Sequence, residues 1–289
     1  MTTVASLPTD LPTSDRPIRL IASDLDGTLL HEHKAVSPRT VAAIAAAQAA
    51  GLVVIAATGR QALQLPEPVT ATGIRYVVAS NGGIGFDLAT ASVLFEDLLS
   101  PTACAEIVRY LVAELEGVRF SAVRDHGARH ACEPGYLALL TPQERQLQWA
   151  HLDVESLADV VAEPTLKLTV RHPSLSADDL LATLAASGLS GFHATTSGAP
   201  FLEIQGDGVT KASGVARLCD CLGVAAAEVL AAGDAKNDIE LLRWAGLGIA
   251  MGNAVPEAKL AADWTTTSNH EDGLALAIEL LLARAGTGS

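Results

Sequence analysis

The stretch IRLIASDLDGTLL, Ile18 to Leu30, contains the pattern that decides the fold. Its apolar run is bounded by Pro17 and Gly27, which predicts a buried strand that ends near Asp24. Asp24 and Asp26 are two residues apart at this end, so both carboxylates can point to one place above a sheet. Such a pair requires a divalent cation such as Mg2+, or one protonated member that serves as an acid. An ordinary acidic turn built on Asp-Gly explains DLDGT equally well.

Composition limits the classes of function. The chain has 289 residues, 49% of them apolar, which suits one large domain or two moderate ones. Lys plus Arg is 19 and Asp plus Glu is 33, a net charge of −14, which argues against nucleic-acid binding through a general basic surface. A small phosphorylated substrate remains possible, because a local basic site or a metal can offset the charge. No run is long and apolar enough to span a membrane, and four cysteines without CxxC pairs favour a reducing, cytoplasmic setting.

Two further strands of the first block also end in small and polar residues. Leu52–Ala56 ends in Thr58-Gly59-Arg60, and Tyr76–Ala79 ends in Ser80-Asn81-Gly82-Gly83. A helix with Ser37 as its N-cap precedes the second strand. Alternating strands and helices predict a parallel sheet, and ligands bind such sheets outside the carboxyl ends of the strands.

The predicted pattern of helices and strands divides the chain into parts. Residues 86–194 mix helices and strands and predict an inserted α+β domain, after which Phe201–Ile204 predicts the return to the first block. We therefore expect an α/β fold: a doubly wound, Rossmann-like parallel-sheet core, 18–85 and 195–289, with an inserted α+β cap domain, 86–194. Residues 1–17, polar and proline-rich, predict a disordered arm.

Two motifs of the second core segment have ordinary explanations when taken singly. Lys211 opens a predicted helix, and on its own it reads as a surface lysine. The segment Gly233 to Asp238 follows a buried strand and enters a helix, so it could be a simple helix cap. Asp234 and Asp238 are four apart, however, and can share one face of that helix.

The four motifs together, DxDGT, TGR, Lys and GDxxND in this order, resemble the haloacid dehalogenase superfamily. The likeness covers roughly 18–85 and 195–284. The large insert, the segment Ala79–Gly83 and Glu271-Asp272-Gly273 resemble the Cof-like phosphatases, which carry an α/β cap. One position departs from the pattern: Ala212 follows the lysine, where a glycine is common.

The resemblance implies a hydrolase, a phosphatase with a Mg2+ cofactor that acts on a small phosphorylated metabolite, for example a sugar phosphate, through an aspartyl-phosphate. Asp24 would attack phosphorus and Asp26 would act as acid and base. The implied metal ligands are Asp24, Asp26 through its backbone carbonyl, Asp234 and Asp238. The implied phosphate-binding residues are Thr58, Gly59, Lys211 and Asn237.

Substrate contacts and partners are less well determined by the sequence. Candidates for substrate binding are Asn81, Arg60, Arg124 and Arg129. A phosphomutase with the same aspartates, or a non-catalytic protein that binds a phosphate ligand, remain alternatives. The chain could be a monomer or a homodimer, with no nucleic acid or membrane as partner.

Overall fold

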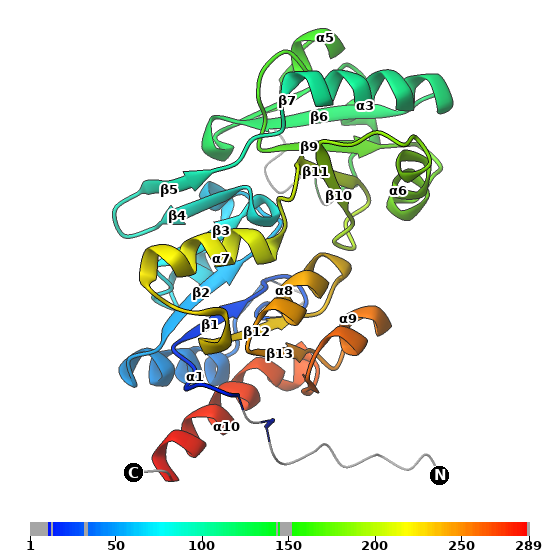
Figure 1. Cartoon of the computed structure of the whole chain (residues 1–289). Coiled ribbons are helices and arrows are strands. Elements are labelled where there is room, and N and C mark those ends of the chain that lie inside the picture. Colours follow the sequence, from blue (N-terminus) through cyan, green and yellow to red (C-terminus); the bar gives the residue numbers. More distant parts are fainter. Residues whose placement is uncertain (1–10, 13, 32–33, 143, 145–151, 288–289) are drawn as a thin grey trace, which may run out of the picture.

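A computed structural model of the chain describes residues 11–12, 14–31, 34–142, 144 and 152–287. These residues form two sheets, one above the other and each with its own helices (Figure 1). The larger sheet has the strand order β14 (Trp264–Thr265), β13 (Leu247–Ala250), β12 (Val229–Gly233), β1 (Leu20–Ser23), β2 (Val53–Ala57), β3 (Tyr76–Ala79), β4 (Ile84–Asp87) and β5 (Ser92–Glu96). The predicted α/β class, a parallel-sheet core with a second α+β part, is confirmed.

Strand β1 lies at the centre of the larger sheet, between β12 and β2. Every residue of β1 and of β12 is buried, as expected for parallel strands that are covered on both faces. The chain adds strands on one side of β1 first and on the other side later. The strand order therefore reverses next to β1, and ligands bind such sheets at the carboxyl ends beside this point.

Helices cover both faces of this sheet. Helices α1 (Pro38–Ala49) and α10 (Gly273–Thr287) pack together on one face, and α7 (Lys211–Leu222), α8 (Ile239–Trp244) and α9 (Pro256–Ala261) pack on the other (Figure 1). The short α2 (Glu67–Thr70) lies between β2 and β3 in the chain. Ser37 caps α1 as predicted, because its hydroxyl accepts a hydrogen bond from the Thr40 N–H.

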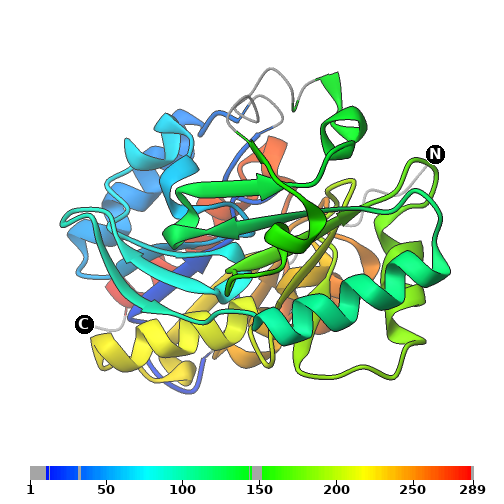
Figure 2. The same ribbon diagram turned by 90° about the horizontal axis from the view of Figure 1, so that it is seen from above.

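The smaller sheet has the order β10 (Phe192–Thr195), β11 (Leu202–Gly206), β9 (Lys167–Arg171), β6 (Arg119–Arg124), β7 (Arg129–Cys132) and β8 (Asp153–Val154). Its helices are α3 (Pro101–Glu114), α5 (Leu157–Val160) and α6 (Ala177–Ala185). We call the described part of residues 100–206 the cap and the other described residues the core. Figure 2, seen from above, shows the cap sheet lying over the core.

The expected boundaries between core and cap need correction at both ends. The expected boundary between 85 and 86 falls inside β4 and leaves β5 in the insert of 86–194, but β4 turns back antiparallel to β3, and β4 and β5 extend the core sheet. Strand β11 was expected to return the chain to the core segment 195–289, but it pairs with β9 and β10 in the cap sheet. The chain re-enters the core only at α7.

The predicted disordered arm, 1–17, also needs correction where it can be tested. Residues 1–10 and 13 lie outside the described residues. Leu11 is buried in the core cluster, Ser14 donates a hydrogen bond to the Ala227 carbonyl, and Arg284 donates one to the Pro12 carbonyl. An apolar side chain and these hydrogen bonds hold the end of the predicted arm against the core. Among the described residues, no helix has the length and apolar character needed to cross a membrane.

Candidate active site

A buried ammonium links two of the predicted motifs. The Nζ of Lys211, at the start of α7, lies 2.6 Å from Oδ1 of Asp24 and 2.6 Å from Oδ1 of Asp238. Asp24 follows β1 and Asp238 follows β12, so neighbouring strands deliver both carboxylates to the carboxyl end of the sheet. Burial alone would lower the pKa of Lys211, but Asp238 and Asp24 outweigh it and raise that pKa. Lys211 is therefore charged and offsets part of the negative charge here.

Asp234 adds a third carboxylate. Oxygens of Asp24, Asp234 and Asp238 lie within 4.8 Å of one another, a group of ligands that could hold a metal ion. Burial and the repulsion from Asp238 raise the pKa of Asp234 to about 6, although the Thr28 hydroxyl donates to it. Burial, opposed by Lys211, also raises the pKa of Asp24 well above its usual value. One ammonium does not balance three carboxylates, so the site favours a further cation.

The turn after β1 approaches this cluster closely, and Gly27 makes the approach possible. Gly27 has φ +88°, and a Cβ at this position would lie 2.3 Å from Oδ2 of Asp234. Its carbonyl accepts a hydrogen bond from Asn253, which fixes the turn from the other side. The Asp-Gly of DLDGT is thus a turn, as the simple explanation held, and it also lies against the acidic cluster.

The loop after β2 holds the second aspartate of the pair. Arg60 donates two hydrogen bonds to the Asp26 carboxylate, each 2.6 Å long. The backbone N–H of Arg60 donates to the Thr58 hydroxyl oxygen, 3.1 Å away. Because that oxygen accepts from the backbone, the hydroxyl proton of Thr58 can point to a ligand instead.

The segment after β3 supports the loop that follows β12. Asn237 donates from Nδ2 to Oδ1 of Asn81 over 2.9 Å, and both residues are buried. The pair leaves one amide atom on each residue without a partner among the described residues. Asn237 lines the cavity described below, and Asn81 lies behind it, so Asn81 acts on the site through Asn237.

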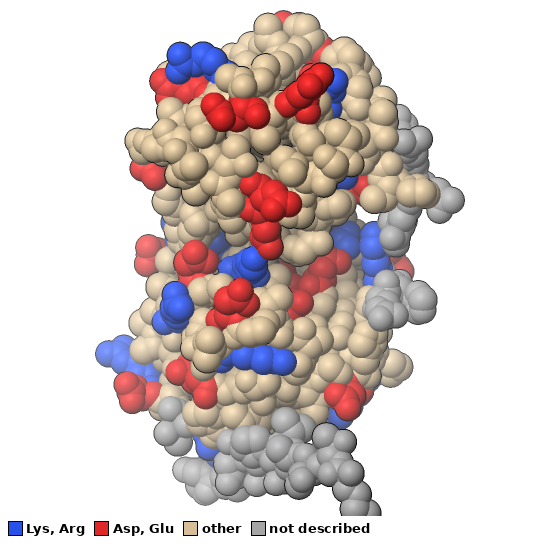
Figure 3. All heavy atoms as spheres, turned by 90° about the vertical axis from the view of Figure 1, so that its right-hand side faces the viewer, with Lys and Arg blue, Asp and Glu red and all other residues tan. Residues whose placement is uncertain are grey.

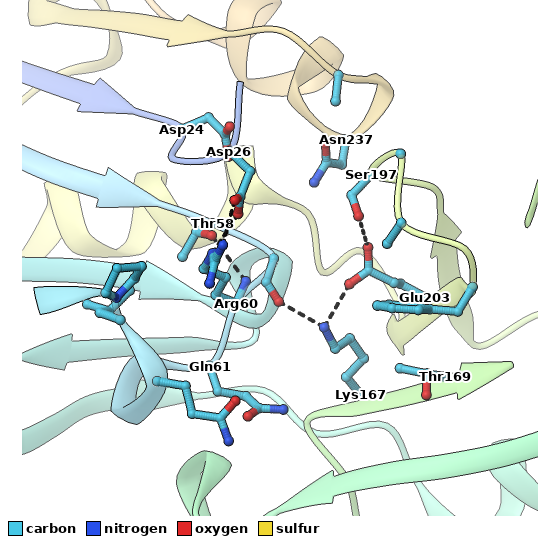
Figure 4. A pocket seen from close by; sticks show the side chains of 18 of the residues that line it. Asp24, Asp26, Thr58, Arg60, Gln61, Lys167, Thr169, Ser197, Glu203 and Asn237 are labelled. Carbon is cyan, nitrogen blue, oxygen red and sulfur yellow. Dashed lines mark hydrogen bonds and ion pairs between the residues drawn. The ribbon is translucent and has the colours of Figure 1, made fainter. Parts of the chain in front are cut away.

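A cavity of about 790 Å3 lies between core and cap at this place. Asp24, Asp26, Thr58, Gly59, Arg60 and Asn237 line it from the core, while Lys211, Asp234 and Asp238 lie behind them. Figure 4 shows Asp24, Asp26, Thr58, Arg60 and Asn237 of the core around the cavity, together with Lys167, Thr169, Ser197 and Glu203 of the cap. On the face shown in Figure 3, acidic and basic side chains gather at the constriction between core and cap.

The cap residues of the cavity are functional candidates that the sequence analysis missed. Lys167 and Thr169 alternate with the buried Leu168 and Val170 along β9, and Glu203 lies between Leu202 and Ile204 in β11. The apolar residues pack under the cap helices and the polar ones face the core. Alternation of polar and apolar residues was the available signal, but in the sequence a lysine or glutamate in a short strand equally fits an exposed edge strand.

Two predicted substrate residues lie elsewhere. Arg124 donates to the carbonyls of Asp159 and Val160, and it also pairs with Glu155. Arg129 pairs with Glu155 and Glu163. Neither arginine is among the residues that line the cavity. Their contacts join β6 and β7 to α5, so we assign them a structural role in the cap in place of substrate binding.

Comparison with known proteins gives the family. Residues 21–278 match the model of the haloacid dehalogenase-like hydrolase family, and the chain belongs to that family. It is 28% identical to the pyridoxal phosphate phosphatase YbhA of Escherichia coli, over 89% of this chain and 96% of that protein. It is 26% identical to the 5-amino-6-(5-phospho-D-ribitylamino)uracil phosphatase YcsE of Bacillus subtilis, over 91% and 96%.

The solved structures agree on the fold. One of a sugar phosphatase, BT4131 of subclass IIB in this superfamily, superposes with a TM-score of 0.77 at 21% identity, covering 90% of this chain and 98% of that one. The resemblance to the Cof-like branch is confirmed. The chain is an enzyme, a haloacid dehalogenase-type phosphoric monoester hydrolase.

Proposed function

We propose that this enzyme is a Mg2+-dependent phosphatase that hydrolyses a small phosphorylated metabolite in the cytoplasm through an aspartyl-phosphate intermediate. The observation that carries the proposal is the buried group of Asp24, Asp234 and Asp238 around Lys211, at the floor of a cavity that a small molecule fits. Four cysteines that are free thiols, three of them buried, suit the cytoplasmic setting.

The donor set suits a hard divalent cation. Carboxylate oxygens of Asp24 and Asp234, with the Asp26 backbone carbonyl, are the ligands that Mg2+ prefers. Asp238 uses one oxygen to accept the backbone N–H groups of Asp234 and Ala235, at 3.0 Å each. Its other oxygen, now on Lys211, would serve the ion directly or through water. When bound, the cation would neutralise the phosphoryl oxygens that otherwise repel a carboxylate nucleophile.

Asp24 is our candidate nucleophile and Asp26 our candidate acid and base. Asp24 lines the cavity with one oxygen held by Lys211, which fixes its direction. Asp26 is more exposed and is oriented by Arg60. It would protonate the leaving oxygen of the ester and then take a proton from the water that cleaves the aspartyl-phosphate.

The remaining predicted residues would bind the phosphoryl group. The Thr58 hydroxyl and the backbone at Gly59 reach the cavity from the loop after β2, and the Asn237 amide reaches it from the loop after β12, next to the ammonium of Lys211. Donors fixed in a buried site stabilise the charge that spreads over the phosphoryl oxygens in the transition state. A sugar phosphate or a phosphorylated cofactor of similar size fits the cavity and the substrates named for the related proteins.

The test is phosphate release from a panel of sugar phosphates and pyridoxal phosphate, with Mg2+ and with EDTA, for wild type and Asp24→Asn. We expect release that requires the metal and is lost in the variant. Release that persists in EDTA would contradict the metal role, and release by Asp24→Asn would contradict the nucleophile. Transfer of the phosphoryl group to a second sugar, without free phosphate, would instead indicate a phosphomutase.

A further inference from the structure

Lys167 makes a polar contact between cap and core beside the groups proposed to handle the phosphoryl ester. Its Nζ donates to the carbonyl oxygen of Gly59 over 2.8 Å and to Oε1 of Glu203 over 2.7 Å (Figure 4). Lys167 and Glu203 come from neighbouring cap strands, whereas Gly59 belongs to the core loop after β2. The contact therefore joins the cap directly to the phosphate-binding loop.

The peptide group that receives this hydrogen bond also controls Thr58. The carbonyl of Gly59 and the N–H of Arg60 belong to the same planar unit. That N–H donates to the Thr58 hydroxyl oxygen, so Lys167 on one end of the peptide fixes the donor on the other. The side chain of the same Arg60 holds Asp26 with two hydrogen bonds. One ammonium of the cap thus acts on two of the groups proposed to handle the phosphoryl ester.

Burial indicates that this ion pair is kept for its geometry. The Lys167 side chain is 7% exposed and that of Glu203 is 2% exposed. Moving two charged groups out of water costs free energy that an exposed ion pair does not lose. A protein with two apolar side chains of the same volume in their place is often at least as stable. The second oxygen of Glu203 accepts from the Ser197 hydroxyl, which holds the glutamate and leaves its partner directed at Gly59.

The space around Gly59 requires a close fit. A Cβ on Gly59 would lie 3.0 Å from Oδ1 of Asn81 and 3.4 Å from Oε1 of Glu203. The loop therefore lies between a core amide and the cap carboxylate, without room for a side chain. Lys167 can reach the Gly59 carbonyl only when the cap lies as close as it does here.

We propose that Lys167 is a positioning residue, which orders the Gly59–Arg60 peptide from the cap and so sets the Thr58 hydroxyl and the Arg60–Asp26 pair when the cap is docked. This inference rests on the proposed function of the site. It makes the cap a contributor to the phosphoryl end of the reaction. Lys167 itself need not touch the substrate.

The first test compares Lys167→Gln with Glu203→Gln. Glu203→Gln leaves the lysine bonded to the Gly59 carbonyl, whereas Lys167→Gln shortens the side chain and removes that bond. We expect kcat to fall about 10- to 100-fold in Lys167→Gln, by the same factor for substrates with different leaving groups, and much less in Glu203→Gln. Lys167→Arg, which keeps a charged donor, should recover part of the rate. Circular dichroism of each variant controls for folding.

The matched control is Asp178→Asn. Asp178 of α6 forms an ion pair between cap and core, with Lys236 at 2.8 Å. Its other oxygen accepts from the Thr196 hydroxyl, so the hydrogen bonds of this carboxylate do not involve the loop of Gly59. It should leave kcat near the wild-type value. Equal losses in Lys167→Gln and Glu203→Gln would overturn the proposal in favour of a structural ion pair. A loss confined to KM that varies with the leaving group would overturn it in favour of direct substrate binding.

Binding of inorganic phosphate separates this inference from the proposed function. In calorimetric titrations with Mg2+ present, Lys167→Gln should bind phosphate about tenfold more weakly than wild type, because the Thr58 donor is no longer fixed. This readout needs no turnover. If wild type hydrolysed no compound yet Lys167→Gln still lost phosphate affinity, the phosphatase proposal would fail while the role of Lys167 stood. Unchanged phosphate affinity in a folded Lys167→Gln would overturn that role.

Discussion

Asp24 and Asp26 share one turn but have different surroundings, and this difference is consistent with the roles proposed for them. Asp24 is buried against Lys211, whereas the side chain of Asp26 is 55% exposed and held by Arg60. A nucleophile needs a fixed direction, and a proton carrier needs access to both the leaving oxygen and water. The two carboxylates of DLDGT can therefore divide the two halves of the reaction between them.

Asp26→Asn should separate formation of the intermediate from its breakdown. An amide cannot accept the proton of the attacking water, so turnover should fall by roughly 100- to 10,000-fold. Intact-protein mass spectrometry of the variant after acid quench should show a phosphorylated form, best seen with a substrate whose leaving group needs no protonation. Asp24→Asn is the matched control and should show none. A phosphorylated form in Asp24→Asn would move the nucleophile to another residue.

Asp234→Asn should weaken the metal site. The change removes one of three carboxylates that lie within 4.8 Å of one another, so Mg2+ affinity should fall by at least about tenfold. Titration of activity with Mg2+ measures the effect, and isothermal calorimetry checks it without substrate. Asp220→Asn changes an exposed carboxylate of α7 and should leave the affinity as it is. Equal affinities in wild type and Asp234→Asn would place the metal elsewhere.

His130 makes the stability of the cap sensitive to acid. Its Nε2 lies 2.9 Å from the Ser121 hydroxyl, and burial, with Lys167 and Arg171 nearby, lowers its pKa from 6.5 to about 3. Between these values the unfolded chain binds the proton and the folded chain does not. The contribution of neutral His130 to the free energy of unfolding is therefore fully present above pH 6.5 and is lost as the pH falls towards 3. The free energy of unfolding should be lower by about 2 kcal/mol at pH 5.

Urea unfolding of wild type and His130→Gln at pH 7 and pH 5 measures this effect. The glutamine keeps a polar partner for Ser121 but does not titrate in this range. The variant should therefore lose less stability on acidification than wild type. The same pH dependence in both proteins would assign the acid sensitivity to other groups.

At the scale of elements, the contact between the β3–β4 turn and the start of α7 positions Lys211. Gly82 has φ +104°, and a Cβ there would lie 1.9 Å from the carbonyl oxygen of Thr210, the residue that caps α7. Thr210 accepts from the Ser213 N–H and so begins the helix at Lys211. A glycine in one element thus allows the lysine of another to reach Asp24.

Gly82→Ala should therefore do more damage than its backbone strain explains. Gly223 also has a positive φ, +64°, but a Cβ there meets nothing within 4 Å, which makes Gly223→Ala the matched control. We expect a loss of about 1 kcal/mol of unfolding free energy in Gly223→Ala and of roughly 3 kcal/mol or more in Gly82→Ala. Chemical denaturation measures both. Equal losses would show that the turn can move away from α7.

The sequence predicted the elements around β1 well because their patterns are local. Apolar runs that end in polar residues located β1, β2, β3 and β12, and the order of motifs located Asp24, Thr58, Lys211 and Asp234. Strand pairing is not local, and so the assignment of β11 to the core was wrong. The composition of the run Phe201–Ile204 suits a strand of either sheet and does not indicate which one it joins. Lys167 was missed for the same reason, since its role depends on a loop more than a hundred residues earlier in the chain.

At the scale of the whole molecule, the cap limits which molecules can reach Asp24. Core and cap enclose a cavity of about 790 Å3, and ion pairs such as Lys236 with Asp178 hold the two parts together beside it. A cavity of this size encloses a small metabolite but not a folded chain. In the proposed reaction the ester lies between Asp24 and Asp26, which both line that cavity.

The enzyme should therefore discriminate by size even when the ester is identical. Free phosphoserine and a phosphoserine within a folded protein present the same phosphate, but the second would hold the cap away from the Gly59 loop. We expect kcat/KM for the phosphoprotein to be lower by at least about 100-fold, because small displacements of the reacting groups already cost that much. A short phosphoserine peptide, which can thread into an open cleft, should fall between the two. Comparable rates on all three would mean that catalysis does not need the docked cap, and the cavity would then be a consequence of the fold with no part in selecting the substrate.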